Sequence, residues 1–523
     1  MSIRRQTFLQ GAVILLAAGV VNRLLGFVPR IALPRMIGAE GVGLIQLVYP
    51  FLIVALTVIA GGLPLAVAKL VAEAEARGDE ARVRRVLVTA LALAGGFSLA
   101  AAGVCYALSE WVAERVMTDV RVRSPFLAML PALPVVAVSS VWRGYFQGRH
   151  NMIPSAVSQT VETLVRIALT LFFAWLFLPR GLEQAASGAV LGMVAGEIAG
   201  LLSLWFWFRG ERERMAAAKR PAGKAASPSG SAPSVTRRLI GIAAPVTGSR
   251  MIGSLSYLLE SILTARSLAA AGVATALATA QYGALQGMIV PLIALPGALT
   301  YSLAVSLVPS LAESAARDDA AAIRKRLHQS LRLAVAAGAP FAMLMGVLAE
   351  PICALLYGHN DIAGLLRLLA PFSIFLYMQP PLQAALQALE RPGVALMNSL
   401  FGAAVKLALI VQLASDIRFG IRGAAVAMGV NMVLVTLLHW VSVARLTGLR
   451  LSPADFVKIG AGAVLAGAAA LWIWNLGALP ADALNLIAAA AAAASLYILA
   501  LVPLGVIDRH DAARLPFIGR LFR

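Results

Sequence analysis

Nine charged side chains stand inside long apolar stretches of the chain, where an unpaired charge is costly to bury. The basic ones are Arg23, Arg30, Arg143, Arg166, Arg250 and Lys406, and the acidic ones are Glu162, Glu197 and Glu260. A guanidinium group donates two parallel hydrogen bonds to a carboxylate or a phosphate, so a cluster of these cations suits an anionic ligand. The residue types therefore predict recognition of a phosphate or carboxylate group in an apolar environment.

Spacing and internal similarity group four basic positions into pairs. Arg23 and Arg30 are seven residues apart, which is two helical turns, so they share one face of a helix. Arg250 is the counterpart of Arg23 in the second half of the chain, and Lys406 is the counterpart of Arg166. Cations related by a repeat are expected to converge on a central axis. The predicted substrate-binding residues are Arg23, Arg30, Arg250, Arg166, Lys406, Arg143 and Glu162.

A structural role is the alternative for three of these residues. Glu162 and Arg166 are four residues apart on one predicted helix, where they can simply neutralise each other. Arg143 is near the cytoplasmic end of its span, from where its side chain can extend to the membrane surface. The sequence alone leaves both alternatives open.

The composition identifies the apolar environment as a membrane. Of 523 residues, 60% are apolar and 13% are charged, whereas soluble domains have roughly half apolar and about a quarter charged residues. This is too little charge to cover several soluble domains. The composition excludes a soluble enzyme, a fibrous protein and a disordered chain, and it predicts an all-α polytopic membrane protein.

Hydropathy predicts about 14 transmembrane helices, each long enough to cross a bilayer. They lie at about 10–33, 43–70, 86–108, 124–146, 156–178, 186–208, 239–265, 281–311, 329–350, 364–388, 394–415, 421–445, 456–476 and 482–503. With the N-terminus inside, and with basic residues near the span ends counted with the adjacent loop, the cytoplasmic segments hold 29 Lys or Arg and the external ones hold 9. The positive-inside rule therefore places both termini in the cytoplasm. This distribution explains much of the net charge of +19 without nucleic acid as a partner.

Internal matches predict two parallel six-helix repeats around a central cavity. Val165–Leu169 matches Val405–Leu409 at an offset of 240 residues. Because six helices are an even number, both repeats have the same orientation in the membrane. The predicted parts are an N-terminal six-helix bundle at 1–208, a basic disordered cytoplasmic linker at 209–238, a C-terminal six-helix bundle at 239–445, and two additional helices with a basic cytoplasmic tail at 446–523.

Two predicted spans are interrupted, and the sequence lacks the common catalytic motifs. Gly61–Pro64 and Pro291–Gly297 interrupt the second and eighth spans, as hinges or as tolerated kinks. The chain has no G-x-S-x-G motif and no Walker loop, and its five histidines show no metal-ligand spacing. We therefore expect no enzymatic activity, no cofactor and no metal.

Several motifs resemble the stage V sporulation protein B family of the multidrug/oligosaccharidyl-lipid/polysaccharide (MOP) exporter superfamily. They are NRLLGFVPR at 22–30, IGAEGVGL at 37–44, GLP at 62–64 and RGYFQG at 143–148. Relatives in this superfamily include the lipid II flippase MurJ. The resemblance implies transport of an undecaprenyl pyrophosphate-linked oligosaccharide across the bacterial plasma membrane, from the inner to the outer leaflet. The implied cargo is lipid II or a related cell-wall or spore-cortex unit, and the implied partners are membrane lipids and cell-wall synthesis proteins.

The resemblance also implies roles for particular residues. Arg23, Arg30 and Arg250 match arginines of the substrate cavity in that family. Sodium-binding relatives have acidic ligands on the seventh, eleventh and twelfth helices, so Glu260 and Asn398 are candidates for coupling to Na⁺ or H⁺. Glu197, an acidic residue within the sixth span, is a further candidate. Gly402 follows Asn398 by one turn and the eleventh span has no carboxylate. This departure from the pattern leaves the identity of a coupling ion open.

Three other functions compete with a flippase. An ion-coupled multidrug exporter would need acidic groups for cationic drugs, whereas the predicted cavity is basic. A membrane enzyme would need a sizeable external loop with reactive residues. A non-transporting wall-assembly scaffold could use the basic linker, but it would have no use for paired arginines within the membrane.

Overall fold

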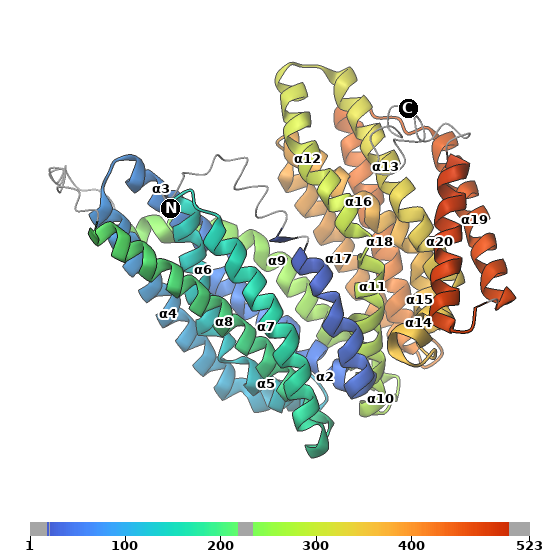
Figure 1. Ribbon diagram of the computed structural model, residues 1–523, viewed down its shortest axis with the longest axis horizontal. Helices are drawn as coiled ribbons and strands as arrows, with labels where there is room; N and C mark the ends of the chain where they lie inside the picture. The colour runs from blue at the N-terminus through green and yellow to red at the C-terminus, as the bar shows by residue number, and fades with distance from the viewer. Residues whose placement is uncertain (1–17, 20, 218–233, 478, 502–523) are drawn as a thin grey trace. The chain divides into compact units, whose positions relative to one another are not determined.

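The structure is a computed structural model that describes residues 18–19, 21–217, 234–477 and 479–501. These residues form helices and connecting turns, without a strand among them. Two compact units can be separated (Figure 1). Unit 1 contains the described residues up to Ala269 together with Val273–Gly287, and unit 2 contains Ala270–Gly272 and the described residues from Met288 onwards.

The helices of unit 1 come mainly from the first predicted repeat. They are α2 (Phe27–Ala60), α3 (Leu63–Ala76), α4 (Glu80–Trp111), α5 (Arg123–Met129), α6 (Ala132–Gly148), α7 (Ile153–Phe177), α8 (Leu182–Ala217), α9 (Val235–Ala270) and α10 (Thr275–Gly283). Shorter helical turns are Val112–Val116, Val120–Val122 and Leu178–Arg180, and Ala284–Ile289 continues from α10. Leu44, Leu70, Leu133 and Phe146 are fully buried in the core of this unit.

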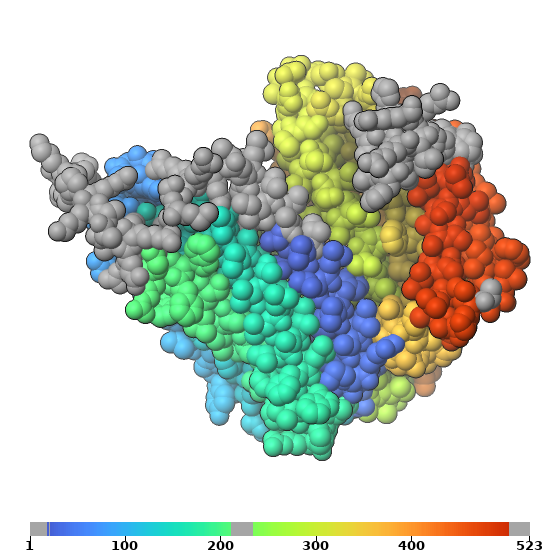
Figure 2. All heavy atoms as spheres, viewed as in Figure 1, coloured from blue at the N-terminus to red at the C-terminus, as the bar shows by residue number. Residues whose placement is uncertain are grey.

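Unit 2 is built from the remaining helices. They are α11 (Val290–Ala294), α12 (Gly297–Ala316), α13 (Ala320–Val347), α14 (Ala349–Tyr357), α15 (Ala363–Leu369), α16 (Ser373–Ala388), α17 (Pro392–Ala414), α18 (Gly420–Thr447), α19 (Pro453–Leu476) and α20 (Asp482–Leu501), with a turn at Ala370–Phe372. Figure 2 shows α19 and α20 (red) packed side by side. Tyr497 on α20 donates a hydrogen bond to the Ala336 carbonyl on α13, 2.8 Å away, which anchors this pair to the unit.

Twelve helical stretches among the described residues are long and apolar enough to cross a membrane, two fewer than the predicted 14. The first two predicted spans lie within one run, Val21–Ala76, because the chain turns at Gly38 with little interruption of the helix. The seventh predicted span corresponds to α9, which carries charged and hydroxyl side chains and is not among the twelve. The polytopic all-α fold is confirmed, whereas the count of 14 stays a prediction.

The turns reproduce the internal repeat at an offset of 240 residues. Left-handed backbone conformations pair Gly78 with Asp318, Thr118 with Gly358, and His150 with Glu390. In the first pair, the residue that follows each member is the N-cap of the next helix, α4 or α13. Asp79 accepts a hydrogen bond from the Arg82 backbone N–H at 2.8 Å, and Asp319 accepts one from Ala322 at 2.9 Å. Equivalent turns at one offset are strong evidence that both halves share a local architecture.

The two compact units do not coincide with the two predicted six-helix repeats. The predicted C-terminal bundle begins at 239, yet α9 and α10 pack in unit 1. A Cβ atom on Gly283 would lie 2.1 Å from the Ala39 carbonyl oxygen, so only glycine permits this approach of α10 to α2. Helices also extend into both ends of the predicted linker, because α8 ends at Ala217 and α9 begins at Val235. The rest of that linker, 218–233, and the tail from 502 lie outside the described residues.

Candidate functional site

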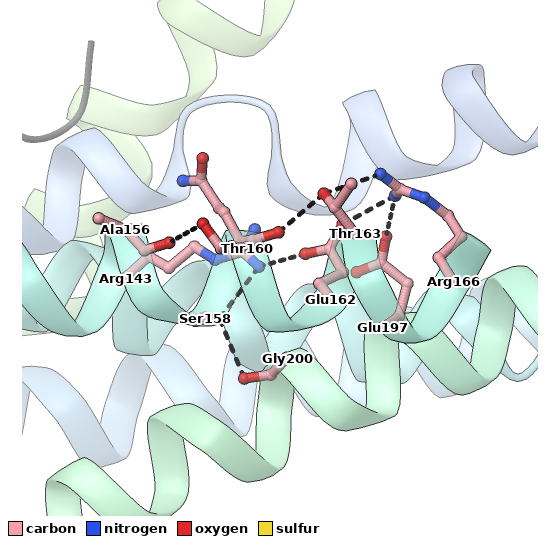
Figure 3. A network of polar contacts seen from close by, with 10 residues as sticks. Arg143, Ala156, Ser158, Thr160, Glu162, Thr163, Arg166, Glu197 and Gly200 are labelled. Carbon is pink, nitrogen blue, oxygen red and sulfur yellow. Dashed lines mark hydrogen bonds and ion pairs between the residues drawn. The ribbon is translucent and has the colours of Figure 1, made fainter. Parts of the chain in front are cut away.

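A network of four charged side chains connects α6, α7 and α8 in unit 1 (Figure 3). Glu162 is at its centre and is only 7% exposed. Arg143 Nη2 lies 2.6 Å from Glu162 Oε2, and Arg166 Nη1 lies 2.9 Å from Glu162 Oε1. Arg166 Nη1 is also 3.9 Å from Glu197 Oε1. Two cations and two carboxylates therefore form one balanced cluster.

Glycines on α8 bring the helices of this network together. A Cβ atom on Gly196 would lie 2.6 Å from the Arg166 Cβ, and one on Gly200 would lie 3.1 Å from the Glu162 Cβ. Ser158 on α7 donates a hydrogen bond to the Gly200 carbonyl at 3.0 Å. The absence of side chains on this face of α8 lets Glu197 reach the ion pair on α7.

This geometry bears on the two structural alternatives for these residues. Glu162 and Arg166 do pair along one helix, as the structural alternative predicted. Arg143 binds the same carboxylate, so its guanidinium has a partner within the helices of unit 1. Its extension to the membrane surface stays a prediction. A cation inside a span needs a partner, and a shared carboxylate supplies one for both arginines. Substrate binding by these three residues stays a prediction.

Arg250 lies at the break between α2 and α3. Its Nη1 donates a hydrogen bond to the Gly61 carbonyl oxygen at 2.7 Å, and the residue as a whole is exposed. Thr247, one turn earlier on α9, accepts a hydrogen bond from the Gly62 backbone N–H at 3.0 Å. A residue predicted to bind substrate is thus also attached to the interrupted backbone of another helix.

The other predicted cations are spread over both units. Arg23 and Arg30 are exposed residues at the start of the first helical run, and the Arg30 guanidinium carbon lies 5.7 Å from the centre of the Phe27 ring. Lys406 is half-buried on α17 in unit 2. Convergence of these side chains on a central axis stays a prediction.

The three candidates for ion coupling have separate partners. Glu260 is 5% exposed and accepts a hydrogen bond from Gln286 Nε2 at 2.7 Å. Asn398 donates one to Ser442 Oγ at 3.0 Å in unit 2, and Glu197 faces Arg166. Among the described residues, no group of three or more His, Cys, Asp or Glu side chains is arranged to hold a metal ion.

Sequence reasoning missed a polar network beside the kink of α2 at Gly38. Asp119 is 2% exposed and accepts hydrogen bonds from Thr279 Oγ1 at 2.8 Å and from Arg121 Nη2 at 2.9 Å. Arg121 also pairs with Glu40 at 2.6 Å. These residues lie in or beside predicted loops, where charges are common, so no pattern in the sequence distinguished them. The network ties α10 to the start of the second half of α2.

Comparisons with known proteins agree with this fold. The model of the polysaccharide biosynthesis protein family matches residues 8–315. Stage V sporulation protein B of Bacillus subtilis (strain 168) is 41% identical over 524 residues, which cover 99% of each chain. The lipid II flippase MurJ of the same organism is 30% identical over 211 residues, covering 38% of this chain and 39% of MurJ.

A solved structure extends the likeness to the whole fold. The structure of the lipid II flippase MurJ in an inward closed conformation has a TM-score of 0.70 at 13% identity, and the match covers 96% of this chain and 100% of MurJ. At this identity the comparison shows the fold alone. The family match and the full-length relative show that the chain belongs to the polysaccharide biosynthesis protein family, and its described residues form a multi-pass membrane protein fold like that of MurJ.

Proposed function

We propose that this protein moves an undecaprenyl-linked oligosaccharide from the inner to the outer leaflet of a bacterial plasma membrane by alternating access. Lipid II or a related cell-wall or spore-cortex unit is the proposed cargo. Both termini face the cytoplasm in this proposal, as the distribution of basic residues predicts. The full-length similarity to a sporulation protein and the local similarity to a lipid II flippase support this class of cargo.

The observation that carries the proposal is a contrast between two groups of arginines in unit 1. Arg143 and Arg166 are bound by the carboxylate of Glu162. Arg23, Arg30 and Arg250 are exposed, although they lie in an apolar helical environment. Exposed guanidinium groups in such a setting favour an anionic ligand, whose oxygens accept several charge-assisted hydrogen bonds at once. A pyrophosphate group linked to a sugar has this chemistry.

Alternating access follows from the cost of moving such a group through lipid. An unpaired charge in hydrocarbon costs many kcal/mol, so the head group needs a polar route with compensating cations. The apolar tail can stay in the bilayer while the head group crosses. The interruption of the helix at Gly61–Gly62 supplies a place where one bundle can bend.

A multidrug exporter is the competing transporter, and the acidic groups argue against it. A cationic drug would need carboxylates available in the cavity. Glu162 and Glu197 face Arg166, and Glu260 is buried with Gln286 as a partner. The exposed charges of the described spans in unit 1 are therefore mainly basic, which favours an anionic cargo.

The test is rescue of bacteria that are depleted of their essential lipid II flippase. We expect growth with the wild-type chain and loss of growth with Arg23→Ala or Arg250→Ala at equal amounts of protein in the membrane. Arg317→Ala is the matched control, because Arg317 is an exposed arginine that pairs with Glu313 at the end of α12. Rescue by both cavity variants would contradict the assigned site, and failure of the wild-type chain would contradict lipid II as the cargo.

A further inference from the structure

The break between α2 and α3 has a definite chemical origin. Proline lacks a backbone N–H, so Pro64 cannot donate a hydrogen bond to Ala60, four residues earlier in the helix. Helix α2 ends at Ala60 and α3 begins at Leu63. At this break the Gly61 N–H still bonds to the Thr57 carbonyl and the Gly62 carbonyl still accepts from the Ala66 N–H. The Gly61 carbonyl and the Gly62 N–H need partners from outside these helices if they are not to remain unsatisfied.

Two side chains of α9 supply those partners. Arg250 donates to the Gly61 carbonyl at 2.7 Å, and Thr247 accepts from the Gly62 N–H at 3.0 Å. Thr247 and Arg250 are three residues apart, so they lie on one face of α9. We use the name clasp for these two side chains and the two backbone groups that they bind.

Glycine at the break is required for the clasp to form. A Cβ atom on Gly62 would lie 2.2 Å from the Ala243 carbonyl oxygen, and one on Gly61 would lie 3.2 Å from Thr247 Oγ1. Ala243 is one turn before Thr247 on α9. The interrupted backbone is thus held directly against α9, and the clasp restrains the segment best suited to act as a hinge.

The chemistry of Arg250 makes the clasp sensitive to anions. A guanidinium group has five N–H donors, and the bond to Gly61 uses one of them. A phosphate oxygen is a stronger acceptor than a neutral peptide carbonyl, because charge-assisted hydrogen bonds are roughly twice as strong. An anion that binds Arg250 across Nη1 and Nη2 would therefore compete with the Gly61 carbonyl for Nη1.

We propose that the clasp holds the hinge closed in the empty transporter and that a phosphate group bound at Arg250 releases it. Thr247 is then a positioning residue, and Arg250 is both a ligand-binding residue and the trigger. This inference rests on the proposed function, since it assumes an anionic cargo. The clasp would then allow the helix to bend at Gly61–Gly62 only when an anion is bound. Because the two equilibria are thermodynamically coupled, opening the clasp must in turn raise the affinity of Arg250 for the anion.

Hydrogen exchange at the Gly62 amide tests the clasp without any assay of transport. The experiment uses the full chain in lipid nanodiscs and mass spectrometry with fragmentation that resolves single amides. Thr247→Val removes the acceptor and keeps the shape of the side chain. We expect exchange at Gly62 to become about five- to ten-fold faster, as expected for the loss of one hydrogen bond of ordinary strength.

Thr57→Val is the matched control. Thr57 is one turn before the break, and its hydroxyl bonds to the Ile53 carbonyl within α2. We expect it to leave exchange at Gly62 unchanged. Exchange in Thr247→Val at the wild-type rate, or equal acceleration in both variants, would overturn the clasp.

Inorganic pyrophosphate is the probe for release. Saturating pyrophosphate, with binding followed by calorimetry, should accelerate exchange at Gly62 in the wild type. Arg250→Ala should exchange rapidly from the start and show no further response. If pyrophosphate binds but exchange at Gly62 is not faster, the proposed release of the clasp is wrong and the proposed function is unaffected. If pyrophosphate does not bind, the proposed release of the clasp by a phosphate group is wrong as well. If pyrophosphate accelerates exchange at Gly62 but the chain fails in the rescue assay, only the proposed cargo is wrong.

Discussion

Glu162 is the shared acceptor of two guanidinium groups, so its replacement by glutamine should destabilise unit 1 strongly. Breaking a buried ion pair by removing one partner costs about 3–5 kcal/mol, because a charge is left without compensation. The side chain of Arg143 is 20% exposed and that of Arg166 is 34% exposed. Water can therefore compensate part of the loss, and we expect the lower end of the range, about 3 kcal/mol.

Glu197→Gln provides the internal comparison for this prediction. Glu197 is 3.9 Å from the same partly exposed Arg166, so its loss should cost about 1 kcal/mol or less. The assay is reversible unfolding in mixed micelles, read as the free energy of unfolding. The double variant Arg143→Met with Glu162→Gln should lose less than the sum of the two single losses. Equal losses for Glu162→Gln and Glu197→Gln would refute the assignment of Glu162 as the centre of the network.

Three further predictions concern the packing of α10, an exposed ion pair and the orientation of the chain. Gly283→Ala should lower the thermal stability of the protein in detergent, because its Cβ would meet the Ala39 carbonyl. Gly297→Ala should not, since no atom of a neighbouring element lies within 4 Å of its Cβ position, and equal stability of the two variants would contradict the packing. Hydrogen bonds from Arg418 lower the pKa of the exposed Asp416 carboxyl to about 2, so any stabilisation from this pair is complete above about pH 4 and lost as the pH falls towards 2. In Arg418→Ala, a carboxyl titration followed by NMR should show the pKa of Asp416 rising towards about 3.9, and an unchanged pKa would contradict this cause. A cysteine at Ser229 in the predicted cytoplasmic linker should resist membrane-impermeant thiol reagents in intact cells and react after lysis, and labelling in intact cells would contradict the proposed topology.

Local patterns in the sequence predicted the helices and their interruptions well. Every predicted span coincides with helical residues in the part of the chain that the structure describes, because runs of apolar residues suffice to indicate a span. The break at Gly61–Gly62 follows from Pro64, and the pair Glu162–Arg166 follows from a spacing of four residues. These features depend on neighbours in the chain, so the sequence contains their cause.

Contacts between helices could not be predicted in the same way. Arg143 reaches Glu162 across 19 positions, and Thr279 reaches Asp119 across 160. Such pairs depend on which faces pack together and on how closely glycines allow the backbones to approach. Likewise, the attachment of α9 to Gly62 through Thr247 requires the tertiary arrangement, and Thr247 has no sequence signature of its own.

The most direct test of the central claim is the movement of a fluorescent lipid II across proteoliposomes that contain only this protein. The account predicts that the wild type and Arg317→Ala move the lipid to the opposite leaflet at similar rates. Arg23→Ala and Arg250→Ala should insert normally and reduce the rate to that of empty liposomes. Transport by both cavity variants at the wild-type rate would contradict recognition of the phosphate by these arginines, and no transport by the wild type would contradict lipid II as the cargo.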